Sequence, residues 1–224
     1  MHRPTKPLEV VVYQDVLCAW CYVATARMDL LRREFGPTVK WSFRPYALRV
    51  KETVPTSREL HQLVSTIERA RKEPEGERLQ KDLWMSPQQD LPRSSLPSLI
   101  ALEAARLQGE DAREVLMRSM QRAALELGIN VARPDVTLEL ASSAGLDLGR
   151  FTAALESPQT RRLVMKEYQL AAGRGVKGVP TLVIGGQWML SGLRCLGEYR
   201  EQILSCMGKR SRGDVESGGD HAMH

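Results

Sequence analysis

The stretch Asp15-Val16-Leu17-Cys18-Ala19-Trp20-Cys21-Tyr22 connects two different sequence patterns. Residues 8–13, before it, are apolar and β-branched and predict a buried strand. After it, apolar side chains recur at helical spacing as far as Phe35 and predict a helix. The start of a helix carries unpaired N–H groups and about half a positive charge, which favours a thiolate at Cys18. Two intervening residues bring Cys21 within disulfide reach. The stretch therefore predicts a redox-active dithiol, with Cys18 exposed and attacking and Cys21 as the resolving thiol.

A Cys-x-x-Cys pair is also half of a common zinc site. Structural zinc usually has four ligands, often from a second Cys-x-x-Cys or a pair of histidines. The other cysteines, Cys195 and Cys206, lie eleven residues apart, and we expect both to be small apolar residues of the last helix. The histidines are scattered along the chain: His2, His61, His221 and His224. A redox pair is favoured over zinc, and no metal site is predicted.

Composition excludes several classes of protein. The 224 residues include 42% apolar residues, enough for a sizeable core, and the net charge is only +5. The arginines are spread over many segments without a basic stripe, so no nucleic-acid partner is expected. No stretch reaches the roughly 20 apolar residues of a membrane span, and the amino terminus does not resemble a secretory signal. We therefore expect a cytoplasmic protein with no membrane partner, and in that compartment a Cys-x-x-Cys is more often catalytic than structural.

The order of predicted elements indicates an α/β fold. A second strand at 39–44 is closed by Pro45, and Gly185-Gly186 between two apolar runs predicts a hairpin. Almost everything between these strands has helical periodicity. The sequence thus predicts a domain built from two parts and interrupted by a helical insertion. The predicted boundaries are 1–56 for the first part, 57–172 for the insertion, 173–207 for the second part and 208–224 for a disordered tail.

The motif Asp15-x-x-Cys18-x-Trp20-Cys21-Tyr22, followed by Gly178-Val179-Pro180-Thr181 and Ser191-Gly192, resembles the DsbA-like thioredoxin-fold oxidoreductase family. It is most similar to the cytosolic FrnE-type branch. The resemblance extends from residue 8 to 207 and implies a thioredoxin-like fold with a mixed sheet and a large all-helical insertion. It implies that Pro180 is a cis-proline lying against the dithiol, and that the backbone of Val179 pairs with an extended substrate. Trp20 offers an apolar surface and is a third candidate substrate-binding residue.

The function that the resemblance implies is thiol–disulfide exchange with proteins or small thiols. No cofactor is expected, and glutathione is a candidate co-substrate. The FrnE-type branch usually has proline where this chain has Ala19. Because Ala19 and Trp20 bring no charge, we expect a less oxidising couple than an intervening histidine would give.

Two alternatives stay open. One is a glutathione-dependent isomerase or transferase of the 2-hydroxychromene-2-carboxylate isomerase and kappa type, which typically has serine at the position of Cys18. The other is a chaperone-like binding module that uses a groove in the insertion. The sequence leaves the substrate, the electron partner, the direction of exchange and the oligomeric state undecided.

Overall fold

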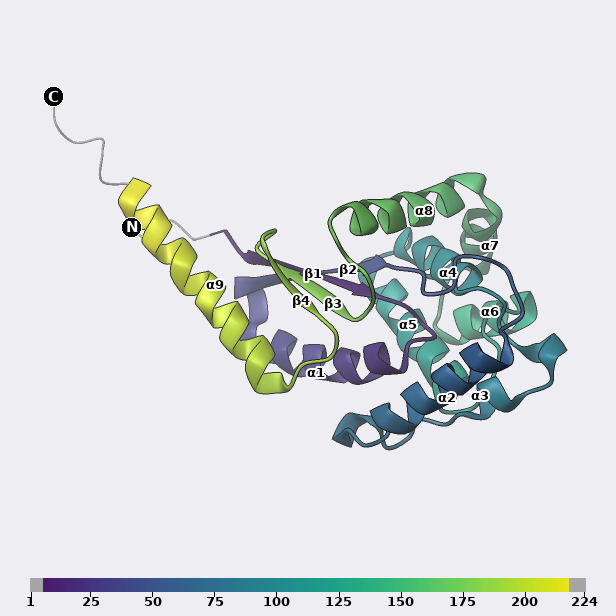
Figure 1. Ribbon diagram of the computed structural model, residues 1–224. Coiled ribbons are helices and arrows are strands. Elements are labelled where there is room, and N and C mark those ends of the chain that lie inside the picture. The colour runs from purple at the N-terminus through teal and green to yellow at the C-terminus, as the bar shows by residue number, and fades with distance from the viewer. Residues whose placement is uncertain (1–5, 218–224) are drawn as a thin grey trace, which may run out of the picture.

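The computed structural model describes residues 6–217, except for the side chains of Gln89 and of residues 210–217. Its centre is one mixed sheet with the strand order β2-β1-β3-β4 (Figure 1). The strands are β1 (Leu8–Gln14), β2 (Val39–Pro45), β3 (Thr181–Ile184) and β4 (Trp188–Ser191). The first strand pairs in parallel with β2 and antiparallel with β3, and β3 pairs antiparallel with β4. The predicted strands and the mixed sheet are confirmed.

The turn between β3 and β4 depends on its two glycines. Gly185 and Gly186 have φ values of 60° and 76°, in the left-handed region that glycine enters at little cost. The chain reverses here, so that Trp188 pairs with Ile184. The hairpin expected from the Gly-Gly pair is present.

Helices cover both faces of the sheet (Figure 1). α1 (Ala19–Phe35) and α9 (Leu196–Ser217) lie on one face, where Met28 and Tyr199 are buried against Val12 and Leu182. α8 (Pro158–Gly173) lies on the other face, where Ala171 packs near Tyr13 and Val183. The alternation of side chains along β1 separates these two apolar layers.

The segment between β2 and β3 is helical throughout its regular structure. It contains α2 (Ser57–Ala70), α3 (Asp82–Met85), α4 (Leu96–Arg106), α5 (Glu110–Leu125), α6 (Pro134–Ser143), α7 (Leu148–Glu156) and α8, with short 3₁₀ turns between some of them. Its largest apolar cluster includes Leu99 and Met120 together with Val16 and Leu17, which precede Cys18. The helical insertion is confirmed, and it shares one core with the segment that carries the dithiol.

The last helix is longer than the sequence indicated. It was expected to end at residue 207, but α9 continues to Ser217, so residues 208–217 are helical rather than disordered. Buried Cys206 and Lys209, whose Nζ lies 4.0 Å from the ring centroid of Trp188, hold this part of α9 beside the hairpin. A glycine such as Gly208 weakens a helix by about 1 kcal/mol but does not end it. The remainder of the predicted tail, 218–224, lies outside the described residues.

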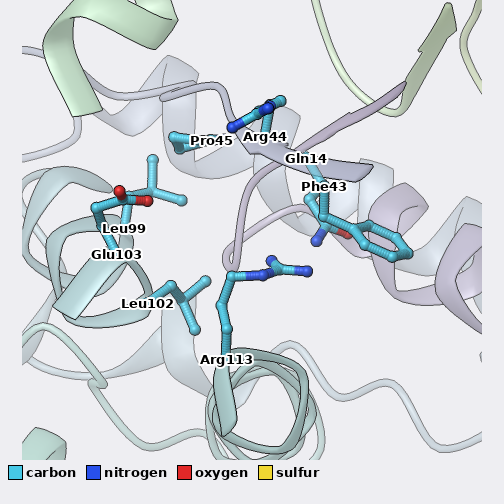
Figure 2. Close-up of a pocket in the computed structure, with 8 residues that line it drawn as sticks. All are labelled: Gln14, Phe43, Arg44, Pro45, Leu99, Leu102, Glu103 and Arg113. Atoms are coloured by element: carbon cyan, nitrogen blue, oxygen red, sulfur yellow. The ribbon is translucent and has the colours of Figure 1, made fainter. Parts of the chain in front are cut away.

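A narrow pocket marks the seam between the sheet and the insertion (Figure 2). Arg113 of α5 extends into it, with its guanidinium 4.9 Å from the ring centroid of Phe43. The lining residues come from β1, β2, α4 and α5: Gln14, Phe43, Arg44, Pro45, Leu99, Leu102, Glu103 and Arg113. Neither Cys18 nor Cys21 lines this pocket, so it is separate from the dithiol.

Candidate functional site

Cys18 occupies the N-cap of α1. Its backbone is extended, with φ −91° and ψ 110°, and its Sγ accepts a hydrogen bond from the N–H of Cys21 at 3.2 Å. The same Sγ lies 3.5 Å from the carbonyl oxygen of Val179, to which a thiol at Cys18 donates. When Cys18 is ionised, the Cys21 N–H and the helix N-terminus are the groups that stabilise the negative sulfur.

The two cysteines differ in access to solvent. Cys18 retains 5% of its surface and Cys21 retains none, and both are free thiols. The expectation that Cys18 is exposed was therefore wrong. The cause is long-range packing, because Leu17 belongs to the large core cluster and the Val179 segment lies against the sulfur. Cys18 is still the more accessible of the pair.

Burial and the neighbouring Cys18 both raise the pKa of the Cys21 thiol. Burial raises the pKa of Cys21 well above its usual range, and the hydrogen bond to Cys18 and the charge of Cys18 raise it further. A high pKa keeps the proton on Cys21, whereas Cys18 is the thiol that retains some contact with solvent. This difference suits Cys18 as the attacking thiol and Cys21 as the resolving thiol, the roles that the sequence predicted.

Asp15 anchors the turn that leads into the dithiol. Its carboxylate is fully buried and accepts hydrogen bonds from the N–H groups of Leu17 at 2.9 Å and Leu48 at 2.7 Å. Its carbonyl oxygen accepts from the N–H of Cys18 at 3.3 Å. Burial raises the pKa of Asp15, although these hydrogen bonds and one to Ser95 act in the opposite direction. Asp15 was expected only as part of the family motif; the signal for its anchoring role was an acidic residue directly after a buried strand.

Val179 and Pro180 lie beside Cys18, as the resemblance implied. The peptide bond between them is cis, Pro180 is buried and Val179 is half-buried. The carbonyl oxygen of Pro180 accepts from the N–H of Gly192 at 2.8 Å, and the Oγ1 of Thr181 donates to the carbonyl of Gly178 at 2.7 Å. Within residues 6–217 the N–H of Val179 has no hydrogen-bond partner. An extended chain can pair with this backbone.

Trp20 connects the site to α2. Its side chain is half-buried and packs against the large core cluster, and the guanidinium of Arg69 lies 6.0 Å from its ring centroid. Such a cation–π contact at a partly exposed site contributes about 0.5–1 kcal/mol. Substrate binding by Trp20 stays a prediction.

The other cysteines differ from each other. Cys206 is buried, as expected, but Cys195 is exposed and precedes α9, so it is not an apolar residue of that helix. The Sγ of Cys195 accepts from the N–H of Glu198 at 3.4 Å, which makes Cys195 a polar cap. Between residues 6 and 217 there is no cluster of three or more His, Cys, Asp or Glu side chains that could hold a metal ion. His2, His221 and His224 lie outside that range.

No helix among the described residues is long and apolar enough to cross a membrane.

Comparison with known proteins gives one family and several structural neighbours. The family described as DSBA-like thioredoxin domain matches residues 9–203. The ClpXP adapter protein SpxH of Bacillus subtilis (strain 168) is 28% identical over 203 residues, which are 90% of this chain and 66% of SpxH. The chain thus spans just under two thirds of the length of that curated relative.

Two solved structures can be aligned with almost the whole of this chain. A putative protein disulfide isomerase from Nitrosomonas europaea has a TM-score of 0.77 at 18% identity, covering 91% of this chain and 98% of its own. The cytosolic disulfide reductase DsbM from Pseudomonas aeruginosa, in a structure with GSH, has a TM-score of 0.66 at 21% identity, covering 92% and 98%. At these identities the likeness shows a shared fold.

Proposed function

Because the chain belongs to the DSBA-like thioredoxin domain family, we propose that it is a thiol–disulfide oxidoreductase that acts through Cys18 and Cys21. One observation carries the proposal: the Sγ of Cys18 lies between the N–H of Cys21 and the carbonyl of Val179, while Cys21 is completely buried. This geometry supports different roles for the two thiols.

The exchange proceeds in two steps. A substrate thiolate attacks the Sγ of Cys18 in the oxidised protein, the Cys18–Cys21 bond breaks, and Cys21 leaves as a thiolate that takes up a proton. The attacking sulfur is now bonded to Cys18. A second substrate thiolate attacks that sulfur, forms the product disulfide and releases Cys18 as a thiolate, which accepts a hydrogen bond from the Cys21 N–H. The reverse sequence reduces a substrate disulfide.

The proposed substrates are proteins or small thiols. The backbone of Val179 presents a free N–H for an extended substrate, and Trp20 offers apolar surface next to Cys18. Glutathione is a proposed co-substrate, in line with the neighbouring DsbM, whose structure was solved with GSH. The FrnE-type assignment and a cytoplasmic location are part of the same proposal. A glutathione-dependent isomerase or transferase is disfavoured, since such enzymes typically lack the cysteine pair.

A second candidate is an adapter or chaperone-like module. It is favoured by the name of the curated relatives, ClpXP adapter protein SpxH, and not by a feature of the dithiol. In that role the chain holds a partner protein, and thiol chemistry is dispensable.

The two candidates are separated by cysteine variants. Oxidised protein is mixed with a reduced, unfolded substrate protein, and substrate disulfides are counted by alkylation and mass spectrometry. An oxidoreductase loses this transfer in Cys18→Ser and retains it in Cys195→Ser, which alters an exposed cysteine outside the Cys-x-x-Cys pair. Equal transfer by all three proteins, or none by the unaltered protein, contradicts the oxidoreductase. Suppression of substrate aggregation that survives Cys18→Ser supports the module.

A further inference from the structure

A groove of about 580 Å³ lies between α1 and α5, and nothing in the exchange mechanism uses it. Helix α1 forms one wall of the groove. Helix α5 and Glu126, which follows it, form the other wall, and the 3₁₀ turn Pro74–Gly76 contributes Glu75. The lining consists of Tyr22, Thr25, Ala26, Asp29, Glu75, Arg118, Gln121, Arg122 and Glu126. We call it the α1–α5 groove.

The α1–α5 groove begins one helical turn beyond the dithiol. Tyr22, Thr25 and Asp29 follow Cys18 by four, seven and eleven residues, so all lie within about 40° of it around the helix. Tyr22 is only about 6 Å along the axis from Cys18. Helical side chains lean towards the N-terminus, which brings Tyr22 still closer to the site. A substrate bonded to Cys18 therefore reaches the groove with a few further bonds.

One wall carries an amide without a protein partner. Gln121 is 2% exposed, and its buried Nε2 makes no hydrogen bond within the described residues. An unpaired buried amide costs about 1–3 kcal/mol, and a ligand oxygen removes that cost. The terminal torsion of glutamine is broad, so the amide can turn towards a ligand.

Most charged side chains that line the groove have a close partner, and Arg122 is the exception. Asp29 is paired with Arg118, and Glu75 is paired with Arg27 at 2.9 Å. Glu126 accepts a hydrogen bond from the hydroxyl of Tyr22 at 2.9 Å.

Arg122 meets Glu126 only at 4.0 Å, and its side chain is 68% exposed. The groups that lack a close partner in the groove are therefore donors, Gln121 and Arg122.

We propose that the α1–α5 groove binds a carboxylate of the substrate whose sulfur reacts at Cys18. The carboxylate lies on a small thiol such as glutathione, or on an acidic residue near the cysteine of a protein substrate. Arg122 supplies the charge and Gln121 supplies a hydrogen bond. This inference rests on the proposed function, because it gives that reaction a substrate class.

The step under test is the first half of the exchange. The substrate thiolate forms a disulfide with Cys18, the Cys18–Cys21 bond breaks, and Cys21 leaves with the electron pair and is protonated. A groove that holds the carboxylate accelerates this step without changing either protein sulfur.

Two matched pairs of probes separate the carboxylate from the rest of the substrate. The first pair is glutathione and its C-terminal amide. The second is a blocked Cys-Ala-Asp peptide and its Cys-Ala-Asn counterpart. Stopped-flow measurements record the mixed disulfide formed with the oxidised protein. We expect the acid of at least one pair to react about fivefold faster than its amide, as expected for one ion pair with an exposed arginine.

The variants are Arg122→Gln, Gln121→Leu and the control Arg133→Gln, at an exposed arginine that directly precedes α6. Arg122→Gln should bring the acid-to-amide ratio close to one and leave the rates of the amides unchanged. Gln121→Leu removes a hydrogen bond that an amide carbonyl also accepts, so it should slow acids and amides alike. Arg133→Gln should retain the ratio. Gln121→Leu removes an unpaired amide, so it should not unfold the protein.

Each outcome has a definite meaning. If glutathione reacts faster than its amide, the substrate is a small thiol. If only the Asp peptide reacts faster than its Asn counterpart, the substrate is a protein. Equal rates within both pairs overturn the groove proposal but leave the oxidoreductase intact, as does a preference that persists in Arg122→Gln. Absence of any thiol–disulfide exchange between the oxidised, unaltered protein and either pair of probes contradicts the proposed function itself.

Discussion

Replacing Asp15 with alanine should destabilise the turn that precedes the dithiol. The change removes the acceptor of two backbone N–H groups, those of Leu17 and Leu48. An unpaired N–H in the core costs about 1–3 kcal/mol, and this value applies to buried Leu17. Leu48 is partly exposed, so water replaces its lost partner at lower cost. The variant no longer buries a carboxylate, and this recovers part of the lost free energy of unfolding. We expect a net decrease of about 1–3 kcal/mol in the free energy of unfolding.

The assay is urea unfolding of the reduced protein, followed by circular dichroism at several pH values. Asp15→Asn keeps one side-chain acceptor, so its free energy of unfolding should decrease less than that of Asp15→Ala. Asp111→Asn is a control at an exposed aspartate, and its free energy of unfolding should change little.

The sign of the pH dependence follows from burial, which raises the pKa of Asp15 above its usual 3.8. The stabilising contribution of such a group is complete below the unfolded pKa and is lost as the pH rises through the folded pKa. The deficit of Asp15→Ala should therefore be larger near pH 4 than at pH 7. An unfolding free energy within about 0.5 kcal/mol of the unaltered protein at both pH values would refute this reasoning.

Three other predictions concern the thiols and their surroundings. In a Cys195→Ser background, iodoacetamide should modify Cys18 at least tenfold faster than Cys21 at pH 7–8, because burial raises the pKa of Cys21; equal rates would contradict the assigned roles. Cys21→Ala should accumulate mixed disulfides at Cys18 and Cys18→Ala should not, as non-reducing electrophoresis would show; similar trapping by both would mean that neither role holds. Trp20→Ala should lower kcat/KM for peptide thiols about three- to tenfold but leave dithiothreitol turnover unchanged, with Trp188→Ala on β4 as the control. A parallel loss with both substrates would assign Trp20 to the fold rather than to substrate binding.

The parts of the fold that could be predicted depend on local patterns. The β-branched run of β1, the helical spacing after Cys21 and the Gly-Gly turn each specify an element from adjacent residues. The place of Val179 and Pro180 beside Cys18 is a contact across 161 residues, and it was expected only because the paired motifs resemble a family.

Other features could not be read from the sequence because they arise from tertiary packing. The burial of Cys18 depends on the core around Leu17 and on the Val179 carbonyl. The α1–α5 groove joins residues about one hundred positions apart, and the unpaired amide of Gln121 has no signature in the sequence. The extension of α9 was missed because Gly208 was interpreted as the start of a tail, although Lys209 contacts Trp188.

The central claim is that Cys18 and Cys21 form a redox-active pair, and a redox titration tests it most directly. The protein is equilibrated in glutathione buffers of graded potential, free thiols are trapped by alkylation, and the intact mass is recorded. We expect a single two-electron transition that converts both thiols to one disulfide, at a potential more reducing than the roughly −120 mV of the strongest oxidants. The transition should be absent in Cys18→Ser. Retention of both thiols across the whole range, or stoichiometric zinc bound to the reduced protein, would contradict it.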